Sequence, residues 1–185
     1  MSRPARIALV VGVLVVLQIA AIWLYRRRGQ RPQPTGASIQ RIDREAPLAE
    51  LAVERAPGQL QNVSTRDGRP RLLHFWATWC PPCRAELPQL IDYSRHLASE
   101  RGVELLAISV DRSWTEIDGF FAGRVPPEIV RAQSPTLHRT YGVDGLPDTY
   151  LVSGDGRLRA RIPGARDWGR SDTRRALQGA LDEVK

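Results

Sequence analysis

The run Phe75-Trp76-Ala77-Thr78-Trp79-Cys80-Pro81-Pro82-Cys83 decides the fold, and it contains the only two cysteines of the chain. The residues before Cys80 are typical of a buried strand, and those after Cys83 carry apolar side chains at helical spacing. A thiol at the start of a helix lies beside free backbone N–H groups and the positive end of the helix dipole, which favour thiolate over thiol. The pair is therefore predicted to be redox-active. The alternatives are a structural disulfide or a metal site, but two cysteines cannot complete a four-thiolate shell and no histidine pair has ligand spacing.

The flanking sequence predicts an α/β domain with a central mixed sheet. Apolar runs indicate strands, apolar residues at helical spacing indicate helices, and Ser153-Gly154-Asp155-Gly156 indicates a hairpin turn. The expected elements are a short strand at 59–63, buried strands at 71–77 and 103–110, a helix after Cys83 kinked by Pro88, a helix at 114–122, a short helix or turn at 135–141, a hairpin of 149–152 with 157–162, and a C-terminal helix.

The N-terminal residues predict a membrane anchor. Residues 7–25 are apolar apart from Gln18 and long enough to cross a bilayer as a helix, with Trp23 and Tyr25 placed as interfacial aromatics. A cleavable signal peptide is the alternative, but no small-x-small site follows the segment. Residues 26–45 are polar and rich in Pro and Gly, as is typical of a linker. The chain is thus divided into an uncleaved anchor (1–25), a linker (26–45) and a globular domain (46–185).

The net charge of +7 does not indicate a nucleic-acid partner. Six arginines and no acid lie within residues 1–31, which leaves about +1 for the rest of the chain. The basic excess therefore flanks the apolar segment. By the positive-inside rule alone, a margin of about one charge would place the domain in the cytoplasm.

Two further motifs accompany the cysteines. Arg84-x-Glu86-x-Pro88 follows Cys83, and Tyr141-Gly142-Val143-x-Gly145-Leu146-Pro147-x-Thr149-Tyr150-Leu151-Val152 precedes a Gly-Asp-Gly turn. Together they resemble the thioredoxin superfamily, and within it the membrane-anchored ResA/TlpA/CcmG-like thiol–disulfide oxidoreductases. The resemblance covers most of residues 58–184 and implies a thioredoxin-like fold.

The position of the cysteines predicts their roles. Cys80, nearest the helix start, is expected to be the exposed attacking thiol, and Cys83 the buried resolving thiol. Pro81 and Pro82 have no N–H, which leaves the Cys83 N–H as the main backbone donor to the Cys80 sulfur. We therefore predict a weakly stabilised thiolate, which suits a reductant.

The resemblance also implies catalytic roles for Pro147 and Glu86. Pro147 would be a cis-proline facing the cysteine pair, with Leu146 offering backbone groups to an extended substrate. Glu86, where the family carries an acid, would exchange protons with the thiols; the alternative is a solvated helix carboxylate. His74 stands where thioredoxins have Asp and this branch commonly has Asn. It is interpreted as a hydrogen-bonded core histidine, with a proton relay to Cys83 as the alternative.

The resemblance implies the function as well. It predicts a periplasmic domain, tethered to the inner membrane by a single span, that reduces extracytoplasmic protein disulfides without a bound cofactor or metal. We prefer this periplasmic location to the cytoplasmic one that the margin of about one charge would indicate. Electrons would come from a CcdA/DsbD-type membrane protein and pass to apocytochrome c or a copper-site assembly protein. The alternatives are a non-catalytic copper metallochaperone, which would need a partnering histidine, and a thiol peroxidase, which would need a Pro-x-x-x-Thr-x-x-Cys setting.

Overall fold

The computed structural model describes residues 39–183 continuously, and Gly12, Val16, Gln18 and Ala20 before them. The chain separates into two units, residues 1–35 and 36–185. Among the described residues, no helix is long and apolar enough to cross a membrane. The predicted anchor, apart from those four residues, and most of the predicted linker lie outside the described residues.

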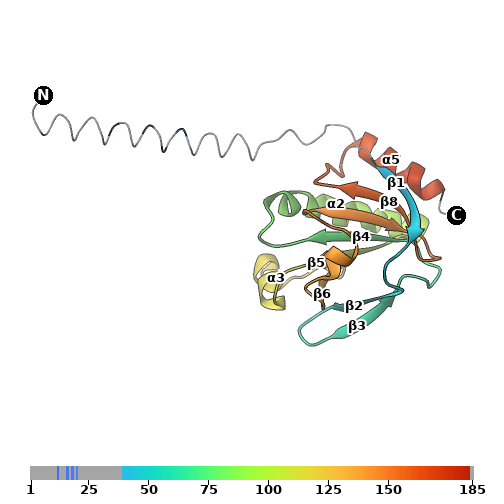
Figure 1. Cartoon of the computed structure of the whole chain (residues 1–185), viewed down its shortest axis with the longest axis horizontal. Coiled ribbons are helices and arrows are strands. Elements are labelled where there is room, and N and C mark those ends of the chain that lie inside the picture. The colour runs from blue at the N-terminus through green and yellow to red at the C-terminus, as the bar shows by residue number, and fades with distance from the viewer. Residues whose placement is uncertain (1–11, 13–15, 17, 19, 21–38, 184–185) are drawn as a thin grey trace, which may run out of the picture. The chain divides into compact units, whose positions relative to one another are not determined.

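The second unit is an α/β domain with one mixed sheet of eight strands (Figure 1). Its elements are β1 (Gln40–Glu45), β2 (Glu50–Glu54), β3 (Leu60–Ser64), β4 (Arg71–Trp76), α2 (Pro81–Arg101), β5 (Glu104–Ser109), α3 (Trp114–Phe121), β6 (Ile129–Ala132), α4 (Leu137–Thr140), β7 (Asp148–Val152), β8 (Arg157–Pro163) and α5 (Ser171–Asp182). The strand order is β1-β8-β7-β4-β5-β6-β2-β3. Strands β4, β5 and β6 run parallel, and the other neighbours are antiparallel.

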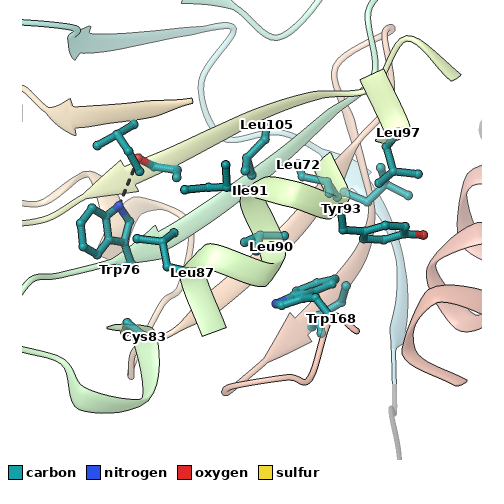
Figure 2. Packing of buried hydrophobic residues seen from close by; sticks show 14 of the residues in the cluster. Leu72, Trp76, Cys83, Leu87, Leu90, Ile91, Tyr93, Leu97, Leu105 and Trp168 are labelled. Carbon is teal, nitrogen blue, oxygen red and sulfur yellow. Dashed lines mark hydrogen bonds between the residues drawn. The ribbon is translucent and has the colours of Figure 1, made fainter. Parts of the chain in front are cut away.

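The central strand β4 is buried on both faces, as its continuous apolar run predicts. Because successive side chains point to opposite faces, Leu72 and Trp76 join the core under α2, while Leu73 and Phe75 join the core on the other face. Figure 2 shows this first core, in which the Trp76 indole donates to the Ala107 carbonyl at 3.2 Å. His74 lies between Leu72 and Trp76 in the strand, so its side chain points to the α2 face.

Helix α2 begins at the cysteine pair and runs through Pro88 to Arg101. It ends where Gly102 adopts the left-handed conformation (φ 67°), which allows its N–H to bond the Ala98 carbonyl. Leu87, Leu90, Ile91 and Leu97 form the buried face of the helix. This packing holds the start of α2, and the cysteines with it, at the end of β4.

The structure contains three strands that the sequence did not predict: β1, β2 and β6. β1 lies at the edge of the sheet, pairs only with β8 and has no buried residue, so it lacks the apolar pattern by which strands are predicted. Residues 40–45 had been assigned to the linker; they belong to the sheet. β6 is only four residues long and too short to show a periodicity.

Candidate active site

The two cysteines form a disulfide at the N-terminus of α2. Cys80 is the N-cap residue, and Pro81 and Pro82 occupy the first two helical positions. The Cys83 N–H donates to Cys80 Sγ at 3.3 Å, which confirms the donor predicted from the Pro-Pro spacer. The Cys80 sulfur therefore accepts a single backbone hydrogen bond where a different spacer could supply more.

Cys80 is less exposed than the sequence predicted. Only 4% of its surface is accessible, against 0% for Cys83. Cys80 is therefore the more accessible of the two, as expected, but the prediction that it is exposed is wrong for this oxidised state. Cys80 lines a groove of about 800 Å³ whose walls include Trp79, Pro82 and Leu146. Trp79 itself is 66% exposed and forms a projecting apolar surface at the rim.

Asp111 holds the turn that precedes Cys80. Its carboxylate accepts hydrogen bonds from the Thr78 backbone N–H (3.0 Å), the Thr78 hydroxyl (2.9 Å) and the Ser109 hydroxyl (2.6 Å). Asp111 is buried and lies just after β5, so these bonds tie the turn to the end of a central strand. Sequence analysis missed this residue; the available signal was an acid directly after a buried strand.

Pro147 is buried just before β7, and the Leu146–Pro147 peptide bond is cis, as the resemblance implied. Leu146 lines the same groove as Cys80. Leu146 has no backbone hydrogen bond within the described part of the chain, which leaves its N–H and C=O available to an incoming segment. Two motifs distant in sequence are thus brought to one groove.

Glu86 is buried, 4% exposed, one turn after Cys83 on α2. The solvated-carboxylate alternative is therefore wrong. Its Oε2 accepts a short hydrogen bond from the Arg166 backbone N–H, and its Oε1 lies 3.6 Å from His74 Nε2. Among the described residues neither Glu86 Oε1 nor His74 Nε2 has a hydrogen-bond partner. On its other side, His74 Nδ1 lies 2.9 Å from the Thr149 hydroxyl, which is the hydrogen bond of the core-histidine interpretation.

Burial sets the protonation of this pair. Desolvation raises the pKa of Glu86 to about 8, although the Arg166 N–H, the Trp168 indole and the Arg166 charge act in the opposite direction. Desolvation lowers the pKa of the His74 imidazole to about 3. Near neutral pH the pair therefore binds one proton, which is held by the carboxyl group.

Three groove residues were given no role by the sequence. Arg112, His138 and Arg139 line the groove together with Cys80 and Leu146. His138 had shown no motif, because the loop after β5, helix α4 and the cis-proline turn are brought together only by the fold. Away from the cysteine pair, no group of three His, Cys, Asp or Glu side chains suited to a metal ion occurs in the part of the chain that the structure describes.

Known proteins resemble this chain over most of its length. A family model described as thioredoxin-like matches residues 68–158. Thiol:disulfide interchange protein HelX of Rhodobacter capsulatus is 31% identical over 137 residues, which covers 73% of this chain and 75% of HelX. Thiol-disulfide oxidoreductase ResA of Bacillus thuringiensis is 29% identical over 147 residues, covering 77% of this chain and 78% of ResA. A crystal structure of a Chlorobium tepidum protein, assigned as thiol:disulfide interchange protein DsbE, matches with a TM-score of 0.62 and 26% identity, covering 78% of this chain and 99% of that one.

Proposed function

We propose that this chain, which belongs to the thioredoxin-like thiol–disulfide oxidoreductases, is a membrane-tethered reductase of protein disulfides outside the cytoplasm. The observation that carries the proposal is the groove itself. It brings Cys80, at the start of α2, beside Leu146 and its unpaired backbone groups. A substrate segment that adds to Leu146 as a short strand would present its disulfide to Cys80.

The exchange proceeds in two displacements. The Cys80 thiolate attacks one sulfur of the substrate disulfide, and the other substrate sulfur leaves as a thiolate and takes up a proton. The Cys83 thiolate then attacks Cys80 Sγ, which releases the first substrate sulfur and closes the Cys80–Cys83 disulfide. Two electrons and two protons pass in total from the protein dithiol to the substrate.

Glu86 is proposed to exchange protons with the buried thiol: its ionised form accepts the Cys83 proton, and its protonated form returns one. Cys83 has no exposed surface, and Glu86 follows it by one helical turn, where side chains are neighbours. The raised pKa of the Glu86 carboxyl group, about 8, is close to the ordinary pKa of a free thiol, about 8.5, so it suits proton exchange with a thiol near neutral pH.

The helix start supports the proposed direction of electron flow, from this protein to its substrate. Each backbone N–H that points at Cys80 Sγ stabilises thiolate and makes the pair more oxidising. Pro81 and Pro82 supply none, and Cys83 supplies one. The pair is therefore a reductant.

The proposed tether is the apolar segment at residues 7–25, acting as a single inner-membrane span with the domain in the periplasm. A CcdA/DsbD-type membrane protein would return electrons to Cys80–Cys83. The substrates would be apocytochrome c or a copper-site assembly protein, as the family resemblance implies. Labelling of an introduced surface cysteine from either side of the membrane tests this topology, and labelling only from the cytoplasm would refute it.

A Cys83→Ser variant of the full chain tests the exchange mechanism. It lacks the resolving thiol, so Cys80 should remain in mixed disulfides with its partners, which can be isolated from membranes and identified. A Cys80→Ser/Cys83→Ser variant is the matched control and should capture nothing. If the single variant captures no more protein than the double variant, the exchange mechanism is wrong.

A further inference from the structure

Both arginines of the groove lining lack an ion-pair partner among the described residues. Most described arginines lie in ion pairs with Asp or Glu. Arg112 and Arg139 are exceptions: both are exposed, and neither side chain has a carboxylate partner within the described residues. Both line the groove that contains Cys80.

The groove combines this positive charge with apolar surface. Trp79 and Leu146 supply apolar surface to the groove that contains Cys80, and Asp144 is the one acidic residue of the lining. His138 belongs to the same lining, and its Nδ1 has no hydrogen-bond partner within the described part of the chain. The lining therefore carries a net positive charge, because it has two guanidinium groups and one carboxylate.

We infer that the groove selects disulfide substrates whose cysteine is flanked by acidic side chains in an extended polypeptide. The inference rests on the proposed function, since it names the substrate chemistry of the same groove. Carboxylates on the incoming segment would form charge-assisted hydrogen bonds with Arg112 and Arg139. Neither arginine would have to break an ion pair with another described residue first. The apolar surface of Trp79 would contact the segment without regard to its charge.

The charge acts mainly on the rate of encounter. Complementary charges at the rim of a binding site speed association, and salt weakens the effect because the Debye length falls. We therefore expect full-length wild-type protein to reduce an acidic disulfide peptide roughly tenfold faster, in kcat/KM, than an otherwise identical peptide with lysines at the flanking positions. The preference should shrink strongly at high salt.

The test uses those two peptides, each closed by one disulfide, and the reduced full-length chain. An Arg112→Glu/Arg139→Glu variant should lose the preference for the acidic peptide or reverse it. Arg124→Glu is the matched control, because Arg124 is also exposed and without a carboxylate partner but lies outside the groove lining, so this variant should keep the wild-type preference. Equal kcat/KM for both peptides in the wild type, or an unchanged preference in the double variant, would overturn the inference.

A small uncharged disulfide separates this inference from the proposed function. If wild-type protein reduces it but shows no preference between the peptides, only the charge selection is wrong. If wild-type protein reduces neither the small disulfide nor either peptide, the reductase function itself is wrong.

Discussion

The buried Glu86 carboxyl group should make the oxidised protein less stable as the pH rises, and Glu86→Gln should remove that loss. Folding raises the pKa of Glu86 from 4.5 to about 8, so the folded state binds more protons than the unfolded state between these values. The stabilisation is complete below the unfolded pKa and is lost as the pH rises through the folded pKa. Each pH unit in this window lowers the free energy of unfolding by about 1.4 kcal/mol.

Comparison of the wild type with Glu86→Gln isolates this carboxyl group, because the two proteins share every other titratable residue. His74, which faces Glu86 from β4, is neutral in the folded state across this range because its folded pKa is lowered to about 3, and its titration in the unfolded state is common to both proteins. The Trp168 indole does not titrate, and the disulfide keeps both cysteines from titrating. Between about pH 6 and about pH 9, Glu86 should therefore cost about 3 kcal/mol of unfolding free energy.

Denaturant unfolding of the oxidised full-length chain, followed by near-ultraviolet circular dichroism, measures the effect. Glutamine resembles the protonated acid, so the Glu86→Gln variant should match the wild type near pH 6 and exceed its stability by about 3 kcal/mol near pH 9. Glu50→Gln, at an exposed position on β2, is the control and should follow the wild-type curve. Parallel pH curves for wild type and Glu86→Gln would refute the raised pKa and with it the proposed proton exchange with Cys83.

Three further predictions concern the surroundings of the cysteine pair. Between about pH 7 and about pH 4, the His74→Asn variant should lose about 3 kcal/mol less unfolding free energy than the wild type, because the unfolded imidazole takes up a proton and the folded one does not. Unfolding curves of both proteins across this range measure the difference, and equal losses on acidification would contradict the prediction. Pro82→Ala restores an N–H near the Cys80 sulfur and should lower the Cys80 pKa by about one unit and raise the reduction potential by about 30 mV, measured by thiolate absorbance and glutathione equilibration; Pro88→Ala, further along the helix, should change neither. Asp111→Ala removes three hydrogen bonds and should cost about 2–4 kcal/mol of unfolding free energy, and a loss under about 0.5 kcal/mol would show that the turn is held by other contacts.

The sequence predicted the parts of the fold that carry strong local patterns. β4 and β5 are continuous apolar runs, and the hairpin of β7 and β8 has a diagnostic turn, so each was expected within one or two residues of its position. The polar edge strand β1 was missed because its stability comes from pairing with β8, which no local pattern records.

The same distinction applies to the site. The Cys83 donor to Cys80 followed from the spacer alone, since both groups lie in one helical turn. The contacts of Glu86 with Arg166 and His74 join α2 to the segment after β8 and to β4, and the bonds of Asp111 join two strand ends. Sequence could name the residue types, but their protonation depends on burial that only the packed domain defines.

Strand β1 has a consequence for how the redox centre meets its partners. With the proposed anchor ending at residue 25, the pairing of Gln40–Glu45 with β8 leaves at most residues 26–39 between the anchor and the sheet, where the sequence predicted a linker of 26–45. Fully extended, fourteen residues span at most about 50 Å. The effective concentration of a tethered group scales roughly as the inverse three-halves power of tether length. If the proposed anchor and the proposed membrane-bound electron donor are both present, a tether of 14 residues therefore gives a local concentration of the domain at that donor about 1.7-fold higher than a tether of 20 residues would.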